Sequence, residues 1–169
     1  EAAGLWMLPP PLVLRTRMWS TAPARLPERV APARGVPADL AHFKALELVE
    51  VVTPEHLLVW NELMICEHPL HNARLVGRQL RYLIRSEHGW LGGIGFGSAA
   101  LYLESRDGWL GWSHAQRTTH LPRVINMTRF LLRPGRRCPN LASHVLGLCA
   151  RRIAADFERH YGLRPWLME

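Results

Sequence analysis

The stretch that decides the fold is 124–161, which reads VINMTRFLLRP, then GRRCPN, then LASHVLGLCARRIAADFERHY. Its first part is rich in branched and apolar residues and stops at Pro134-Gly135, so it predicts a buried strand. Its last part repeats apolar residues with helical spacing and predicts a long amphipathic helix. The buried face of that helix comprises Ala142, Val145, Leu146, Cys149, Ile153 and Phe157. A strand, a short basic loop and a helix therefore form the centre of the predicted fold.

Two further features of this helix are readable from the sequence. Asn140 is placed to cap it, and Pro139 suits its first turn, where a missing N–H costs nothing. A second stripe of small residues predicts that another backbone comes close to the helix. The stripe consists of Ser143, Gly147, Ala150 and Ala154.

The start of the helix is a candidate anion site. A helix N-terminus presents free N–H groups and a partial positive charge, which together suit a phosphate. Three arginines lie within one loop of it: Arg133, Arg136 and Arg137. The predicted phosphate site also includes the first residues of the helix, Asn140, Leu141 and Ala142. A solvated basic loop explains the same residues, and both alternatives stay open.

Two polar residues, Asn126 and Arg129, interrupt the apolar strand. Three positions apart, they face opposite sides unless a β-bulge intervenes. A buried arginine needs a partner, which we expect to be a carboxylate or a ligand anion. Both residues are candidates for a catalytic role, with a purely structural pairing as the alternative.

The composition restricts the class of protein. A chain of 169 residues suffices for one domain with a hydrophobic core. The net charge of +7 favours an acidic partner, such as nucleic acid, a phosphorylated cofactor or an anionic surface. Lys44 is the only lysine, and arginine is the better bidentate phosphate ligand. A GC-rich genome also produces this preference.

The cysteines and histidines point to no disulfide framework and no metal. Three cysteines without framework spacing indicate a reducing compartment, so we expect a cytoplasmic protein. The longest uncharged run, 89–103, is too short and too glycine-rich to cross a membrane. His68 and His71 are three apart, but Pro69 prevents a regular metal-binding helix, and we predict no metal site.

The remaining chain predicts a mixed sheet. Residues 1–40 hold seven of the thirteen prolines and predict a disordered tail or linker, with the folded domain at 41–169. We expect a strand over 46–52, a helix that starts at Thr53-Pro54, and a hairpin of 79–86 with a strand from Trp90. Asp107-Gly108 predicts a turn, and 113–121 a short helix or loop. Strands on both sides of the long helix predict a parallel pair.

One face of the second hairpin strand is nearly without side chains. It comprises Leu91, Gly93, Gly95, Gly97 and Ala99. On such a face a ligand or a helix can lie directly on the backbone.

Four phrases of the sequence are distinctive when taken in order: LVGRQLRY at 75–82, GWLGWS at 108–113, NMTRFL at 126–131 and PNLASH at 139–144. Together they resemble the DruA family of the Druantia anti-phage system. The resemblance implies a bacterial or archaeal protein from phage-defence islands, a family also found at the front of transposase-like proteins. It implies other defence-system or transposase subunits as partners. Family members continue past a strand like 164–169, so we expect this copy to be truncated. They also have an acidic residue after Trp112-Ser113, where this chain has His114.

The order of strand, basic loop and helix also resembles the acyl-CoA-binding core of the GCN5-related N-acetyltransferases. There a loop of the form Arg/Gln-x-x-Gly-x-Gly/Ala holds the cofactor pyrophosphate. The stretch 137–142, RCPNLA, matches the first and last positions, but Asn140 replaces glycine and Pro139 removes a donor. The resemblance implies acetyl-CoA or another acyl-CoA, whose acyl arm would lie on the glycine face. It also implies a bulge that brings Asn126 and Arg129 to one side.

We therefore predict an α/β fold with a mixed β-sheet flanked by helices, acyl-CoA N-acyltransferase-like and truncated at the C-terminus. The predicted function is that of a DruA-like defence or mobile-element component which binds nucleic acid through the basic loop. Arg117 and Arg123 are expected to add phosphate contacts. The alternative is an acyl-CoA-dependent N-acyltransferase that uses the same loop for the cofactor.

Overall fold

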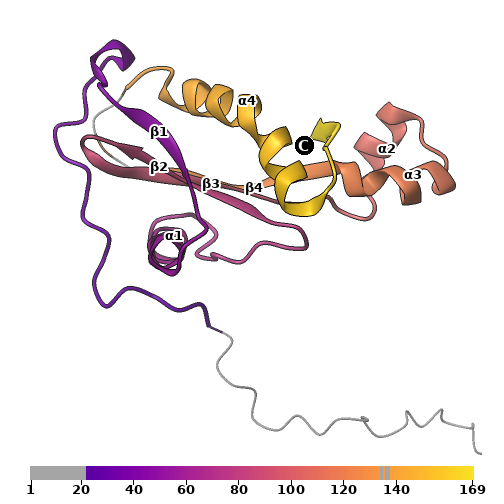
Figure 1. Cartoon of the computed structure of the whole chain (residues 1–169), viewed down its shortest axis with the longest axis horizontal. Helices are drawn as coiled ribbons and strands as arrows, with labels where there is room; N and C mark the ends of the chain where they lie inside the picture. The colour runs from indigo at the N-terminus through magenta and orange to yellow at the C-terminus, as the bar shows by residue number, and fades with distance from the viewer. Residues whose placement is uncertain (1–21, 134, 136–137) are drawn as a thin grey trace, which may run out of the picture.

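A five-stranded sheet with the order β1-β2-β3-β4-β5 forms the centre of the structure (Figure 1). This computed structural model describes residues 22–133, 135 and 138–169. The strands are β1 (Leu46–Glu50), β2 (Leu80–Ser86), β3 (Gly89–Ser98), β4 (Val124–Leu132) and β5 (Leu167–Met168). Strands β1 to β4 pair antiparallel, and β5 pairs parallel with β4. The predicted α/β class, the mixed sheet and the parallel pair across the long helix are confirmed.

Helices cover both faces of the sheet and one end of it. They are α1 (Pro54–Cys66), α2 (Glu104–Leu110), α3 (His114–His120) and α4 (Leu141–Tyr161), with 3₁₀ turns η1 (Leu40–His42) and η2 (Leu121–Arg123). Helices α1 and α4 lie on opposite faces, and α2 and α3 project beyond the end of the sheet (Figure 1). The predicted turn at Asp107-Gly108 is wrong, because both residues lie inside α2, which ends at Gly111 in the left-handed conformation.

The predicted caps of α1 and α4 are only partly confirmed. The Thr53 hydroxyl accepts a hydrogen bond from the His56 N–H at 3.3 Å, and Pro54 is the first residue of α1, as predicted. Asn140 precedes α4 as predicted, but its φ is +63° and its side chain makes no capping hydrogen bond. Pro139 lies before the cap rather than in the first turn. The prediction that another backbone packs against the small-residue stripe of α4 is wrong, since Ser143 and Ala150 are exposed.

The sheet separates two hydrophobic clusters. On the α4 face, the buried residues are centred on Tyr82, Ile84, Ile94, Phe96, Val145, Cys149 and Phe157. On the α1 face they are centred on Trp60, Leu63, Met64, Leu75, Leu83 and Leu131. The predicted core face of α4 is therefore confirmed. The side chains of β2 alternate between the two clusters, with Tyr82 and Ile84 in the first and Leu83 in the second.

A β-bulge interrupts β4. The register between β3 and β4 shifts directly after Gly95, which leaves Thr128 as the extra residue. Because of this bulge, Asn126 and Arg129 face the same side of the sheet, as the resemblance to acyltransferases predicts. A second shift, between β2 and β3, turns Leu91 toward α4, so its predicted place on the glycine face is wrong.

The glycine face of β3 is filled by the protein itself. A Cβ on Gly95 would lie 2.6 Å from the Trp60 ring, and a Cβ on Gly97 would lie 2.9 Å from the carbonyl oxygen of Val76. Helix α1 and the segment 72–77 therefore lie directly on the strand. The expectation that this face leaves room for an acyl arm is wrong.

Residues 22–40 form a strap rather than a free tail. The Asn61 amide donates to the carbonyl oxygen of Ala24 at 2.8 Å, and Arg25 makes two hydrogen bonds to Glu62 at 2.8 and 2.9 Å. The bond from Arg25 lowers the pKa of the Glu62 carboxyl, although burial opposes this. The first part of the described linker, 24–30, is thus held against α1, whereas Ala33 and Val36 pack against the α4-side cluster. Residues 1–21 lie outside the described residues.

A buried polar cluster joins α4 to the sheet. Asp156 accepts hydrogen bonds from the Tyr82 hydroxyl at 2.8 Å, from Arg152 at 2.7 Å and from Arg159 at 2.8 Å. Burial alone would raise the pKa of Asp156, but these donors outweigh it and lower the pKa. Arg152 also donates to the carbonyl oxygen of Leu48 at 2.8 Å, so the cluster reaches β1.

Replacement of Gly95 by alanine is expected to destabilise the protein by about 1–3 kcal/mol, because the new Cβ overlaps the buried Trp60 ring. The matched control is Gly108→Ala in α2, where a Cβ meets nothing within 4 Å. That change should stabilise by about 0.5–1 kcal/mol through helix propensity. Urea denaturation measures both, and equal effects of the two substitutions would contradict the packing.

The Asp156→Asn substitution is expected to lower the free energy of unfolding by about 3 kcal/mol at neutral pH, because it removes the buried carboxylate to which Tyr82, Arg152 and Arg159 donate. Since the folded-state pKa of Asp156 is depressed, this contribution is present above the pKa of the unfolded carboxyl, about 4. It is lost as the pH falls through the lower folded pKa. Thermal unfolding of both proteins from neutral to acidic pH measures the difference. Arg151→Ala, at an exposed position of the same helix, should change stability by less than about 0.5 kcal/mol.

Candidate functional site

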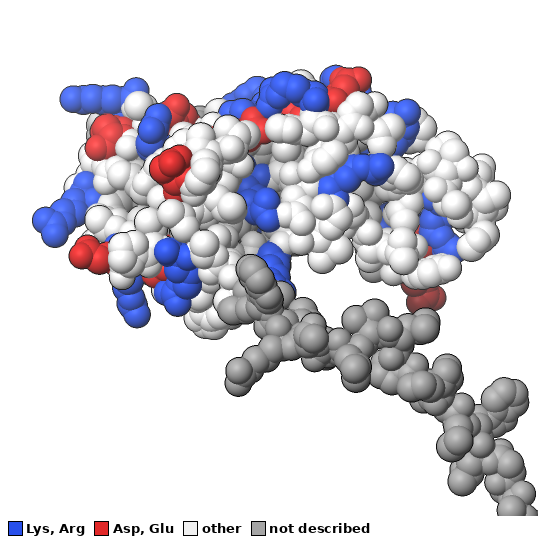
Figure 2. All heavy atoms as spheres, turned by 60° about the horizontal axis from the view of Figure 1, so that its bottom comes forward, with Lys and Arg blue, Asp and Glu red and all other residues white. Residues whose placement is uncertain are grey.

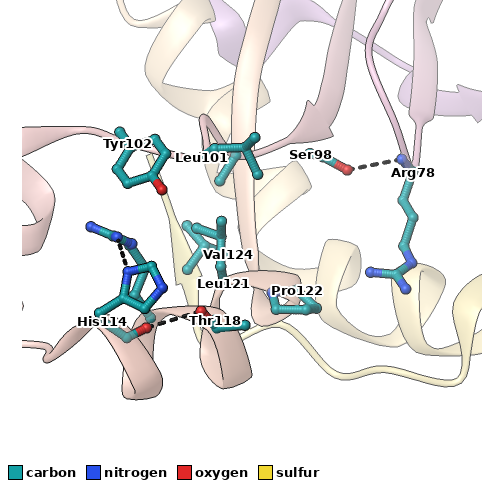
Figure 3. Close-up of a pocket in the computed structure, with 11 residues that line it drawn as sticks. Arg78, Ser98, Leu101, Tyr102, His114, Thr118, Leu121, Pro122 and Val124 are labelled. Carbon is teal, nitrogen blue, oxygen red and sulfur yellow. Dashed lines mark hydrogen bonds between the residues drawn. The ribbon is translucent and has the colours of Figure 1, made fainter.

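A cavity of about 320 Å³ opens where α3 and η2 meet the end of β3 and the start of β4 (Figure 3). Its lining consists of Arg78, Ser98, Ala99, Leu101, Tyr102, His114, Arg117, Thr118, Leu121, Pro122 and Val124. These residues come from the segment before β2, from both ends of the β3–β4 connection, and from α3. We call it the α3 cavity.

The backbone fixes one wall of the α3 cavity. The Ser98 hydroxyl accepts a hydrogen bond from the backbone N–H of Arg78 at 3.0 Å. Gly77 has φ +68°, and a Cβ there would lie 2.1 Å from that hydroxyl oxygen. Only glycine fits this close approach without a shift, and it holds Arg78 beside the end of β3.

The start of α3 fixes the opposite wall. Ser113 and Gln116 form a capping box, in which the Ser113 hydroxyl accepts from the Gln116 N–H and the Gln116 side chain accepts from the Ser113 N–H. This cap places His114 at the first position of the helix. His114 is the position at which the resemblance to the family leads us to expect an acidic residue.

Arg117 is held on three sides within this wall. Its guanidinium carbon lies 4.2 Å from the centre of the Tyr102 ring, a cation–π contact. Its nitrogens donate to Asp107 at 3.2 Å and to His114 Nδ1 at 2.8 Å. Because arginine only donates, Nδ1 of His114 is the acceptor in this contact.

Asp107 anchors this arrangement from behind. Partial burial opposes its ionisation, but hydrogen bonds from Arg106 and Arg117 lower its pKa. Arg106 is buried and also pairs with Glu169 at 3.2 Å. The ion pairs therefore hold Arg117 in place, and Arg117 in turn contacts the face of the Tyr102 ring.

The α3 cavity combines an apolar floor with a cationic rim. Leu121 and Val124 form the floor, and Arg78 lies across the cavity from Tyr102 (Figure 3). Among the described residues that line it there is no carboxylate and no thiol, and the Thr118 hydroxyl donates to a helix carbonyl at 3.0 Å. This arrangement suits binding of an anionic ligand with a flat apolar part.

Arg117 and Arg123, predicted to contact nucleic acid, both lie at this end of the molecule. Arg117 lines the cavity. Arg123 directly follows the lining residue Pro122, and its guanidinium carbon lies 4.8 Å from the centre of the Trp166 ring. Arg123 also donates to the carbonyl oxygen of Arg164 at 3.1 Å.

The candidate catalytic residues Asn126 and Arg129 lie outside the lining of the α3 cavity. Arg129 donates to the carbonyl oxygens of Asn72 at 2.8 Å, Arg74 at 3.1 Å and Thr128 at 2.7 Å. The expected carboxylate or ligand anion is thus replaced by backbone carbonyls, and Arg129 fixes the segment 72–74. Asn126 is partly buried on the same face.

Arg133, the first arginine of the predicted phosphate site, is engaged within the chain. It makes two hydrogen bonds to Glu67, at 2.7 and 2.8 Å. It also donates to the carbonyl oxygens of Val30 at 2.8 Å, Ala31 at 2.6 Å and Trp90 at 3.2 Å. Only 9% of its side chain is exposed, so it fastens the strap to β4 and the end of α1.

The rest of the predicted phosphate site is only partly described. Asn140, Leu141 and Ala142 lie at the start of α4 as expected, and the Leu141 N–H donates to the carbonyl oxygen of Cys138 at 3.4 Å. Arg136 and Arg137 lie outside the described residues. A phosphate site at this helix start stays a prediction that depends on these two arginines.

The described part of the chain contains no cluster of three or more metal-ligating side chains. His71 Nδ1 lies 2.9 Å from the carbonyl oxygen of Ile65, and His68 Nδ1 accepts from the Leu70 N–H. Across the same residues, no helix combines the length and apolar character that a membrane crossing requires.

Sequence reasoning missed the α3 cavity and Tyr102. The sequence contained one indication, the apolar run Leu101-Tyr102-Leu103 directly before a helix. In the structure this run is not part of the core, since Leu101 is 71% and Tyr102 69% exposed. Two of the four family phrases also reach the cavity, one through Arg78 and the other through Ser113, which caps α3.

The fold and site define an α/β protein with a cationic cavity that has an aromatic wall. Residues 23–169 match the family described as Druantia protein DruA. The chain belongs to this family, as the resemblance of its four phrases predicts. Comparisons with curated proteins and with solved structures found no match.

An Arg133→Gln substitution is expected to lower the free energy of unfolding by about 3 kcal/mol, because Glu67 and three carbonyl groups lose their donor. The strap should loosen, and trypsin should cleave after Arg29 faster than in the wild type. Mass spectrometry of timed digests measures this.

Arg164→Gln is the matched control, since its pair with Glu158 is exposed on both sides and should contribute less than about 1 kcal/mol. A stable Arg133→Gln protein that loses affinity for anions would instead assign Arg133 to the phosphate site.

Proposed function

We propose that this chain is a DruA-like component of a bacterial anti-phage defence or mobile-element system that binds nucleic acid in the cytoplasm. Membership of the Druantia protein DruA family supports the defence role. The net charge of +7 supports an anionic partner. Other defence-system or transposase subunits are the proteins with which it would act.

The observation that carries the proposal is the distribution of charge partners. Many arginines away from the α3 cavity pair with carboxylates: Arg25, Arg85, Arg133, Arg152, Arg159 and Arg164. Within the described residues, no ion pair is found for Arg78 or Arg123. Arg117 shares the Asp107 carboxylate with Arg106. Asp107 and Glu169 together balance Arg106 and Arg117, so the uncompensated charge at the cavity is that of Arg78 and Arg123. Arg34 and Arg151 also make no ion pair within the described residues, but they lie away from the cavity.

The distribution of surface charge favours contact with a few phosphates over binding along a long DNA duplex. On the face seen in Figure 2, basic and acidic side chains lie interspersed, with uncharged surface between them and no continuous basic stripe. A protein that follows duplex DNA over many phosphates needs such a stripe. The arginines at the cavity support contact with a few phosphates instead.

Arg78→Gln and Arg123→Gln are each expected to weaken binding of single-stranded DNA by about tenfold, and to reduce the slope of log K against log salt by about 0.7. Fluorescence anisotropy over a salt series measures both quantities. Arg85→Gln removes the same charge at an exposed pair with Glu47 and should leave the affinity unchanged. Equal losses in all three variants would mean that only net charge matters, which contradicts a site at the cavity.

An acyl-CoA-dependent N-acyltransferase is the second candidate. The bulge at Thr128, the loop before α4 and the parallel pairing of β4 with β5 favour it. The filled glycine face argues against it, because it removes the space expected for the acyl arm. Our proposal predicts no change of melting temperature with coenzyme A. A saturable increase that Arg136→Ala with Arg137→Ala abolishes would favour the acyltransferase.

A further inference from the structure

We infer that the α3 cavity receives one unpaired nucleotide of a single strand, with its base against Tyr102 and its phosphate beside Arg78. This inference rests on the proposed function and specifies its ligand. Binding of this kind would make the chain selective for single-stranded or locally opened nucleic acid.

The size and lining of the cavity suit a nucleobase. Its volume of about 320 Å³ lies at the lower end of the range for small-ligand sites. Leu101, Leu121 and Val124 supply apolar surface for the flat faces of a ring. A base inside a duplex is stacked on both sides and cannot enter, so only an unpaired or extruded nucleotide fits.

Tyr102 is a preformed stacking platform. Its side chain is 69% exposed, which is unusual for a large ring that packs nothing in the core. Arg117 lies against the ring at 4.2 Å and is itself fixed by Asp107 and His114. An exposed ring stiffened by a cation is the arrangement on which single-strand binders stack bases.

The charged residues around the cavity determine which end of it receives the phosphate and which receives the base. Tyr102 and Arg117 also line a second hollow, which contains Glu104 and Asp107. Two carboxylates disfavour a phosphate there. Across the α3 cavity, Arg78 offers a guanidinium with no ion pair within the described residues (Figure 3). The phosphate is therefore assigned to the Arg78 side and the base to the Tyr102 side.

The test compares three fluorescein-labelled probes of equal length: an oligothymidylate, the same backbone without bases, and a duplex. Anisotropy titrations should show that the wild-type chain binds the oligothymidylate about tenfold more tightly than the abasic strand. Tyr102→Ala should remove this preference, whereas Tyr102→Phe should keep it, because the ring and not the hydroxyl forms the platform.

Two further variants separate the cavity from the surface around it. Thr118→Trp, at an exposed position of α3, should fill the cavity and remove the preference as Tyr102→Ala does. Trp109→Ala removes a ring that is 78% exposed but lines neither hollow, and should leave the preference intact. Circular dichroism of each variant confirms that it is folded.

The outcomes distinguish this inference from the proposed function. If the abasic strand binds as tightly as the oligothymidylate and Arg78→Gln weakens both, the inference fails and nucleic-acid binding stands. Tighter binding of the duplex than of the single strand also overturns the inference. If none of the probes binds, both the inference and the proposed function fail.

Discussion

The structure depends on the contact between the Trp60 ring and the glycines of β3. The ring lies so close to Gly93 and Gly95 that a Cβ on either would come within about 3 Å of it. The Trp60 indole N–H also donates to the carbonyl oxygen of Ala73 at 3.0 Å, which fixes the segment that follows α1. That segment continues along β3 to Arg78. One buried contact therefore positions the cationic wall of a cavity at the other end of the sheet.

Arginine has two uses in this protein, and composition alone does not separate them. Arg129, Arg133 and Arg152 each donate to backbone carbonyls of segments far away in the sequence, and two of them also pair with carboxylates. Such hydrogen bonds from a charged donor contribute more than neutral ones, and their loss leaves buried acceptors unpaired. These arginines connect the strap, α1, α4 and the sheet. The net charge of +7 thus overstates the cationic surface that is available to a ligand.

The sequence predicted the parts of the fold that depend on local patterns. Strand β4, the buried face of α4 and the hairpin follow from periodicity and turn residues, which act over a few positions. The bulge at Thr128 was expected from the resemblance to acyltransferases rather than from the residues. Helix α2 was missed because Asp107-Gly108 is a turn signal that the surrounding helix overrides.

The partners of arginines and the α3 cavity could not be predicted in this way. Arg133 donates to Val30, 103 positions earlier, and Arg129 donates to Asn72, 57 positions earlier. No local pattern indicates such contacts. The strap was predicted as a linker because its prolines exclude helix and strand, yet they leave side chains and carbonyl groups free to pack. The cavity combines residues of several segments, each of which is unremarkable alone.

Cross-linking of a single strand that contains 4-thiothymidine to the wild-type chain tests the central claim most directly. Ultraviolet irradiation, digestion and mass spectrometry identify the peptides that touch the bases. Our account predicts cross-links within 98–124, the segment that forms the aromatic wall and the floor of the α3 cavity. Cross-links confined to 133–144, at the start of α4, or no cross-link at all, would contradict it.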